Sequence, residues 1–188
     1  MPGGCCGVMW NGFSTTAQTT LLRCSKSTRL SKLGVAMDVN RKAPAWAEAE
    51  TYINAPVELV WQVQAAIESW PKWNRKVEAV RMEGPLQRGT TFRWKSGGAS
   101  IISTLQEVRP GVRIGWTGKT FGIRALHVWE FKDLDGRTHV KTAESFEGWL
   151  ASLFPGLMRK MLRKALDGAI GSLKAECERG PAKGGFPR

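Results

Sequence analysis

The sequence predicts an α+β fold in which a seven-stranded antiparallel sheet is covered on one face by a long C-terminal helix. Turn signals rich in Gly, Pro and Asp recur between residues 84 and 136, and they separate runs rich in Val, Ile, Thr, Phe and Trp. A run that alternates small or apolar residues with acidic ones lies upstream, at 46–53. Residues 157–177 instead repeat apolar residues every three or four positions, which is typical of an amphipathic helix.

The predicted closing helix has an apolar stripe and a basic side. The stripe consists of Met158, Met161, Leu162, Ala165, Ala169, Ile170 and Leu173. The basic side carries Arg159, Lys160, Arg163, Lys164 and Lys174. A helix of about twenty residues is roughly 30 Å long, which is enough to cross a small domain.

Six predicted strands follow one another with short connections, as in an antiparallel meander, and one strand upstream makes seven. They are expected at 46–53, 77–83, 90–95, 100–108, 112–117, 124–132 and 138–146. Short helical segments are expected between the first two strands, opening at Asn54-Ala55-Pro56 and followed by a turn at 69–74. A sheet with one apolar face needs a cover, and the closing helix supplies it.

The positive charge is concentrated at the two ends of the chain. The net charge is +12, but residues 44–179 hold 20 basic and 15 acidic residues. Solvated basic tails explain this distribution better than a nucleic-acid groove, and neither an RNP-like motif nor a helix-turn-helix is present. We therefore expect no nucleic-acid partner. The expected organisation is a disordered or targeting extension at 1–43, one domain at 44–179 and a disordered tail at 180–188.

The cysteines and histidines offer little for metal or redox chemistry. Cys5, Cys6, Cys24 and Cys177 form no CxxC motif, and the chain has two histidines. We expect no metal site and no cofactor. This cysteine usage fits a reducing compartment, so a cytoplasmic location is expected. The alternative is an organelle, if residues 1–36 are a transit peptide.

Several fragments, in this order, resemble the START-like (SRPBCC) superfamily, and within it the polyketide cyclase/dehydrase and lipid-transport group. The fragments are 49–61 (AETYINAPVELVW), 70–74 (WPKWN), 89–94 (GTTFRW), 122–129 (GIRALHVW) and 144–149 (ESFEGW). The resemblance covers residues 46–178. It implies a helix-grip fold, in which a curved sheet wraps around the C-terminal helix, and a cavity between them for an apolar molecule. It implies no particular reaction.

The Asp135-Gly136 turn predicts a register for the last two strands. A two-residue hairpin turn there pairs Leu134 with Arg137 and, by alternation, His127 with Glu144. We expect this pair on the sheet face that points to the helix, where it would orient a polar group of a ligand. The two residues are also the candidates for proton transfer; the alternative is a mutually satisfied polar pair at the sheet edge.

Aromatic residues on the same strands are candidates for the wall of the cavity. Core packing is the default role of each tryptophan, but three in one sheet also suit a flat ligand. Trp70 and Trp73, beside a proline turn, are expected at the surface or the cavity mouth. The expected ligand-binding residues are Phe92, Trp94, Trp116, His127, Trp129, Thr142 and Glu144, with Arg93 as a further orienting group.

Three functions remain open at this stage. The leading hypothesis is a binding or carrier protein for a small hydrophobic or aromatic molecule, lipid-like or polyketide-like. The alternatives are a polyketide cyclase, aromatase or dehydratase using His127 and Glu144, and a regulatory module whose pocket controls a partner. The basic run at 158–164 is expected to be a solvated face, with membrane contact as the less favoured interpretation. The sequence does not predict an oligomeric state.

Overall fold

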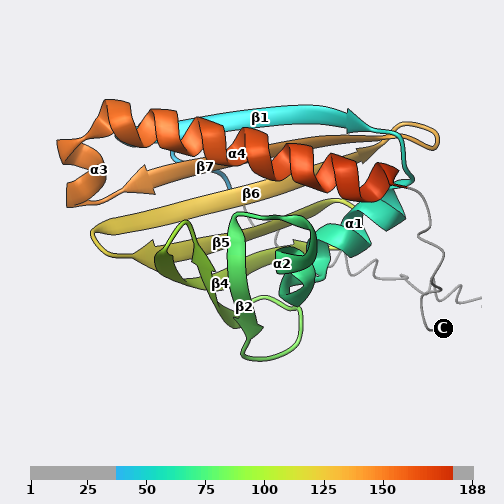
Figure 1. The fold of residues 1–188 in the computed structure, drawn as a ribbon, viewed down its shortest axis with the longest axis horizontal. Helices are drawn as coiled ribbons and strands as arrows, with labels where there is room; N and C mark the ends of the chain where they lie inside the picture. Colours follow the sequence, from blue (N-terminus) through green and yellow to red (C-terminus); the bar gives the residue numbers. More distant parts are fainter. Residues whose placement is uncertain (1–36, 180–188) are drawn as a thin grey trace, which may run out of the picture. The chain divides into compact units, whose positions relative to one another are not determined.

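One antiparallel sheet of seven strands carries the fold (Figure 1). The computed structural model describes residues 37–179; the expectations for residues 1–36 and 180–188 lie outside this range. The strand order is β1-β7-β6-β5-β4-β3-β2, so only β1 leaves the sequential order of a meander. The strands are β1 (Ala45–Ile53), β2 (Val77–Met82), β3 (Thr91–Ser96), β4 (Ala99–Arg109), β5 (Arg113–Thr120), β6 (Ile123–Asp133) and β7 (Thr138–Glu147).

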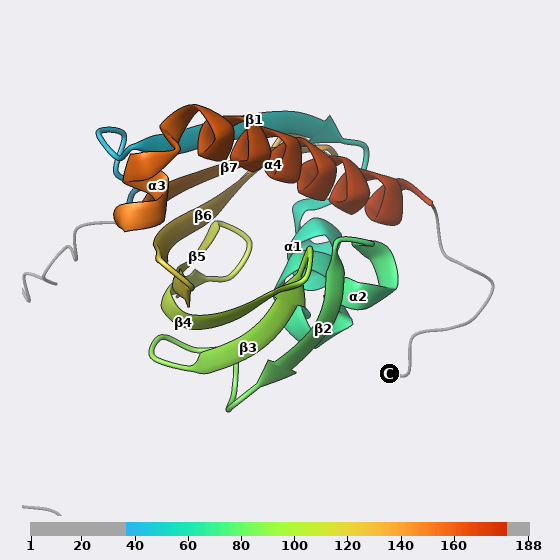
Figure 2. The ribbon, with the colours of Figure 1, turned by 60° about the vertical axis from the view of Figure 1, so that its left-hand side comes forward.

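The predicted α+β helix-grip class is confirmed. Figure 2 shows the sheet bending around α4 (Pro155–Glu178), with the short helices α1 (Val57–Ala65), η1 (Ile67–Ser69) and α2 (Trp70–Trp73) between β1 and β2. A short helix that was not expected, α3 (Trp149–Leu153), connects β7 to α4. We call the face of the sheet that points to α4 the inner face.

The register of β6 and β7 follows from their turn. Asp135 and Gly136 both have positive φ, 52° and 91°, as a two-residue primed turn requires. Leu134 and Arg137 exchange backbone hydrogen bonds across it, at 2.8 and 3.4 Å. The predicted pairing of His127 with Glu144 is confirmed.

Helix α4 lies over β1 and β7. Its buried residues are Met158, Leu162, Leu166, Ile170, Leu173 and Cys177. Met158, Leu162 and Leu166 pack over small residues on β1, where Ala45 and Ala47 are almost fully buried, and the other three join the main core. Small side chains on the strand allow the helix to approach the sheet closely.

The apolar stripe of α4 is narrower than predicted. Met161 was placed in it, but this side chain is 54% exposed, whereas Leu166 is 1% exposed. The buried residues follow steps of three and four from Met158 to Cys177, and Met161 lies to one side of that line. Ala165, also placed in the stripe, is exposed as well, so the stripe runs through Leu166 instead of Met161 and Ala165.

Helices η1 and α2 cover the rest of the inner face. Trp70 begins α2, is 4% exposed, and packs against Phe92, Trp94 and Trp116 with ring centroids 5.5–5.8 Å apart. The expectation of a surface or gate position is wrong for Trp70, because its indole nitrogen also donates a hydrogen bond to the carbonyl oxygen of Gln64, at 2.9 Å. Trp73 is only partly buried.

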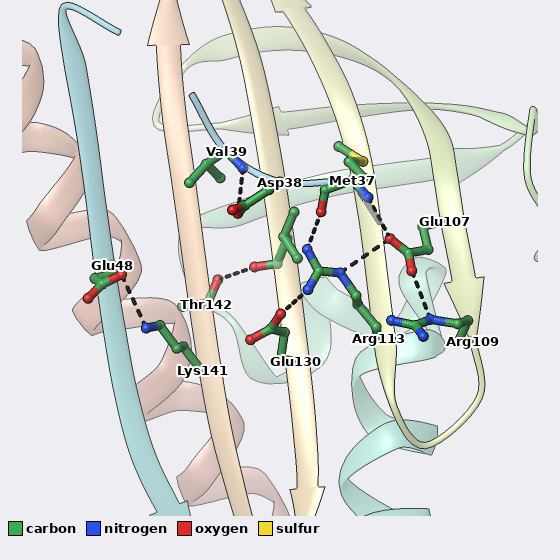
Figure 3. A network of polar contacts seen from close by, with 11 residues as sticks. Met37, Asp38, Val39, Glu48, Glu107, Arg109, Arg113, Glu130, Lys141 and Thr142 are labelled. Carbon is green, nitrogen blue, oxygen red and sulfur yellow. Dashed lines mark hydrogen bonds and ion pairs between the residues drawn. The ribbon is translucent and has the colours of Figure 1, made fainter. Parts of the chain in front are cut away.

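The outer face of the sheet holds residues 37–43, which the expected domain limit at residue 44 did not include. Val39 packs on Val128 and Ala143. The backbone N–H of Met37 donates to Glu107 Oε2 at 3.1 Å, and Arg113 donates to the carbonyl oxygen of Met37 (Figure 3). This segment thus adds to the fold opposite α4.

Candidate functional site

The candidate site is built around His127 on β6 and Glu144 on β7. They are directly opposite each other in the antiparallel ladder, and His127 Nδ1 lies 3.5 Å from Glu144 Oε1. Both side chains are largely buried, with 9% and 12% exposed. The neighbour of Glu144 on its other side is Ala47 of β1, whose small side chain supplies no polar partner.

Burial keeps this pair uncharged. It lowers the pKa of His127 to about 3 and raises the pKa of Glu144 to about 8. Both shifts have the same cause, because transfer out of water disfavours the charged form of either group. At neutral pH the site therefore holds a neutral imidazole beside a carboxylic acid.

The hydrogen bonds of Thr142 assign the tautomer of His127. The Thr142 hydroxyl donates to the carbonyl oxygen of Val128 at 3.2 Å (Figure 3). Its oxygen is then an acceptor toward His127 Nε2, 2.9 Å away. The proton of the neutral ring is on Nε2, which leaves Nδ1 as a bare acceptor.

Two polar atoms of the inner face are buried without a partner among the described residues. They are Nδ1 of His127, which has Glu144 Oε1 at 3.5 Å but forms no hydrogen bond, and Nε1 of Trp129; both are on the same face of β6. An unpaired buried polar group costs about 1–3 kcal/mol, so such groups are uncommon unless they serve a ligand or water. The site presents an acceptor, an N–H donor and a carboxylic acid.

Aromatic rings surround these atoms. The centroid of the His127 ring lies 4.7 Å from the centroid of the Trp116 ring and 5.7 Å from that of the Trp129 ring. Phe92 contacts Trp116 with centroids 5.9 Å apart. All seven predicted ligand-binding residues are on the inner face, and the ring contacts and the pairings of β6 with β7 join them in one group.

Toward the turn between β5 and β6, the inner face carries small residues beside His127. These are Ser103, Gly118 and Ala125. A Cβ built on Gly118 would lie 3.3 Å from Ser103 Oγ and 3.5 Å from Ala125 Cβ, so the three are mutual neighbours. Sequence reasoning did not single them out, because small residues in a strand carry no chemical signal.

The predicted orienting residue Arg93 does not join this group. It faces Arg81 and Ile102 in the register, on the outer side of the sheet, and forms an ion pair with Glu83 at 2.6 Å. Alternation explains the placement: Phe92 and Trp94 point inward, so the residue between them points outward.

Two hollows stand out among the described residues, and neither is lined by His127 or Trp129. The larger, about 570 Å³, crosses β2 to β5. It is lined by Ala79, Val80, Arg81, Arg93, Trp94, Lys95, Ser100, Ile101, Ile102, Lys119 and Thr120. The smaller, about 330 Å³, lies between η1 and the end of β2 and is lined by Ala65, Ala66, Ile67, Glu68, Ser69, Met82, Gly84 and Leu86. Neither of these two hollows thus reaches the His127–Glu144 pair.

Within residues 37–179, His, Cys, Asp and Glu side chains nowhere gather in a set of three or more that could bind a metal ion. The helices of the same range also include none with the length and hydrophobicity of a membrane span.

The curved sheet, the gripping helix and the buried aromatic face define a helix-grip protein of the START-like (SRPBCC) superfamily. The family model for polyketide cyclase/dehydrase and lipid transport matches residues 45–178, and the chain belongs to this family. A comparison with curated proteins finds no match.

Solved structures with the same fold come from several organisms. A hypothetical protein from Helicobacter pylori has 19% identity and a TM-score of 0.65, covering 74% of this chain and 91% of its own. A START superfamily protein from Mycobacterium smegmatis has 15% identity and a TM-score of 0.63, covering 71% and 97%. An aromatase/cyclase from Streptomyces sp. R1128 has 20% identity and a TM-score of 0.57, covering 75% and 98%. At these identities the likeness shows the fold.

Proposed function

We propose that the protein binds a small apolar or aromatic molecule with a hydroxyl or carbonyl group, between the inner face of the sheet and α4. The observation that supports this most strongly is the pair of unpartnered buried atoms, Nδ1 of His127 and Nε1 of Trp129, set in an aromatic wall. A hydroxyl group can donate to the first and accept from the second. The rest of the ligand contributes apolar burial, at about 25 cal/mol per Å².

The ligand site that we propose includes the small residues beside His127. Ser103, Gly118 and Ala125 put three small side chains between Trp116 and the turn of β5 and β6. Larger side chains border them: Trp94 Nε1 donates to Ser103 Oγ at 3.0 Å, and Phe146 pairs with Ala125. Because neither hollow reaches His127, binding requires the cover formed by α2 and α4 to move away from the sheet. Apolar burial of the ligand then replaces the contacts that the cover gives up.

A titration with naphthol, a neutral aromatic alcohol, followed by quenching of tryptophan fluorescence, tests this proposal. Ala125→Phe adds a large side chain beside His127, and we expect it to remove binding. Because Ala125 is half-buried, the free energy of unfolding should fall by no more than about 1–3 kcal/mol. Equal affinity of wild type and Ala125→Phe would contradict the proposal.

The chain supplies a matched control for the polar pair. His139 and Glu50 form a second pair on the outer face, 3.1 Å apart. Replacement of His127 and Glu144 by Gln should weaken naphthol binding by roughly fivefold to tenfold, the loss of about one hydrogen bond. Replacement of His139 and Glu50 by Gln should leave it unchanged.

A second candidate is an enzyme of the cyclase or dehydratase type. It is favoured by one observation: a neutral acid and a neutral base face each other at 3.5 Å in a buried apolar setting. Positioned proton transfer contributes about a hundredfold or more to rates. An enzyme of this type would lose at least that factor in turnover of a linear polyketone when His127 becomes Gln, whereas a carrier would show no turnover in either form.

A further inference from the structure

The exposed apolar side chains of the described residues gather at one end of the molecule. Nine large apolar side chains are exposed in residues 37–179, and six of them come from the β5–β6 turn, α3 and the start of α4. We call these six the apolar end: Phe121 (80% exposed), Trp149 (57%), Leu153 (62%), Phe154 (47%), Leu157 (55%) and Met161 (54%). Isolated exposed apolar residues are ordinary, but a contiguous group marks an interaction surface.

Contacts along the chain make the apolar end contiguous. The rings of Phe121 and Trp149 meet edge to face, with centroids 5.5 Å apart. Trp149 and Leu153 are one helical turn apart on α3, and Leu157 and Met161 are one turn apart on α4. Figure 1 shows α3 and the turn between β5 and β6 at the same end of the sheet.

A glycine pair builds this junction. Gly148 has φ of 110°, and a Cβ there would overlap the carbonyl oxygen of Gly122 in the β5–β6 turn. Only glycine allows this approach, which also lets the N–H of Leu150 donate to the Gly122 carbonyl oxygen at 3.3 Å. The apolar side chains of two distant segments are thereby held side by side on a fixed backbone.

Cations border the apolar end. Leu157, Lys160, Met161 and Lys164 follow steps of three, one and three, which places them on one face of α4, away from the sheet. Neither lysine forms an ion pair within residues 37–179. Lys119 and Arg124, paired in the register, form the base of the turn that carries Phe121.

Acidic residues are missing from the same stretch. Residues 148–166 contain no Asp or Glu, but four cations. The acids at its limits are Glu147, which accepts a hydrogen bond from Asn40, and the exposed Asp167. A protein partner would need a matching apolar cavity for each protruding ring, whereas a lipid surface accepts Phe, Trp and Leu side chains of any arrangement and attracts the lysines.

We propose that the apolar end docks on an anionic lipid membrane, with Phe121, Leu153 and Leu157 entering the headgroup region and Lys160 and Lys164 contacting lipid phosphates. This goes beyond ligand binding and holds whether or not the inner face takes a ligand. For residues 158–164 we thus prefer membrane contact to the sequence-based interpretation as a solvated face. The reason is that the exposed Leu157 and Met161 are part of a larger surface with Phe121 and Trp149.

Co-sedimentation of the full chain with phosphatidylcholine vesicles, with and without about 30% phosphatidylglycerol, tests the proposal. We expect binding to the anionic vesicles and weaker binding at high salt. The triple variant Phe121→Ser, Leu153→Ser, Leu157→Ser should bind at least about tenfold more weakly, because it removes three exposed side chains. Lys160→Ala and Lys164→Ala should each weaken binding roughly fivefold.

Matched controls use exposed residues elsewhere in the structure. Ile102→Ser with Val112→Ser, and Lys132→Ala with Arg137→Ala, should bind like wild type. The triple variant keeps every charge of the chain, including those of 1–36 and 180–188. Equal vesicle binding by wild type and triple variant would therefore show that charge alone is responsible for binding, and it would overturn the proposal. So would absence of vesicle binding, or a dimer in solution that the triple variant dissociates.

Discussion

Two histidine–glutamate pairs span this sheet, and their surroundings set their chemistry. His139 and Glu50 lie on the outer face, where 24% and 61% of their side chains are exposed. His127 and Glu144 lie on the inner face and are held in their neutral forms by burial. The same residue types thus give a solvated contact on one side and a buried acid–base pair on the other.

The inner pair makes stability depend on pH in a way that variants can resolve. For Glu144 the folded pKa of about 8 exceeds the ordinary value of 4.5, so its contribution to the free energy of unfolding is complete below pH 4.5 and is lost as the pH rises to 8. For His127 the folded pKa of about 3 is below the ordinary value of 6.5. Its contribution to the free energy of unfolding is therefore complete above pH 6.5 and is lost as the pH falls to 3. Between pH 4.5 and 6.5 the two residues change the free energy of unfolding with pH in opposite directions, and their effects cancel.

Denaturant unfolding of wild type and Glu144→Gln at several pH values checks this account. We expect the stability of Glu144→Gln relative to wild type to increase from pH 4.5 to 8, at a slope of up to about 1.4 kcal/mol per pH unit. His127→Asn should lose stability relative to wild type as the pH rises from 3 to 6.5. A constant difference across pH 4.5 to 8 for Glu144→Gln would mean that Glu144 is ionised in the folded protein.

Arg113 is a buried cation on the opposite face. It pairs with Glu107 and Glu130 and donates to the carbonyl oxygen of Met37, and 10% of its side chain is exposed (Figure 3). A buried charge must be paired, so this residue ties β5 to β4, β6 and the segment at 37–43.

Replacement of Arg113 by Met should lower the free energy of unfolding by about 3 kcal/mol, because Glu130 and the Met37 carbonyl lose their partner. Arg93→Met is the matched control: this arginine pairs with Glu83 but is 57% exposed, and its loss should cost less than about 1 kcal/mol. Urea unfolding measures both. Equal losses for the two variants would contradict the structural role of Arg113.

At the scale of elements, hydrophobic periodicity predicted the strands well and the details of α4 less well. The seven predicted strands are all present, with limits within three residues of those observed. Hydrophobic periodicity alone did not decide which apolar line of the helix is buried, and Met161 and Leu166 are about 140° apart around its axis. The tertiary contact with Ala47 and Ala49 decides between them, and no local pattern contains it.

Alanine replacements on α4 distinguish the two lines. Leu166→Ala should cost about 2–5 kcal/mol, because it opens a cavity between α4 and β1, whereas Met161→Ala should stay within about 0.5 kcal/mol. Thermal or denaturant unfolding provides the measurement. Comparable losses for the two variants would mean that α4 is rotated about its axis relative to the structure described here.

The site was predictable where it depends on strand alternation. The Asp135-Gly136 turn sets the register, and the register brings His127 to Glu144, Trp129 to Thr142 and Trp116 to His127. It was not predictable where it depends on irregular segments. Trp70 belongs to a four-residue helix whose orientation is set by packing on Phe92 and Trp116, and Arg93 was misplaced because its face was not counted.

At the scale of the whole molecule, three surfaces compete for ligands. They are the inner face around Trp116 and Trp129, the hollow across β2 to β5 that Trp94 borders, and the apolar end with Trp149. Each surface has its own tryptophan, so one spectrum can report on all of them.

The indole N–H signals of the full chain, assigned by single Trp→Phe variants and followed by NMR during titration with naphthol, provide the most direct test of binding at the inner face. We predict that the signals of Trp129 and Trp116 shift, with Trp129 shifting furthest because its Nε1 gains a hydrogen bond, and that Ala125→Phe abolishes these shifts. Shifts confined to Trp149, or no shift at all, would contradict binding between the sheet and α4.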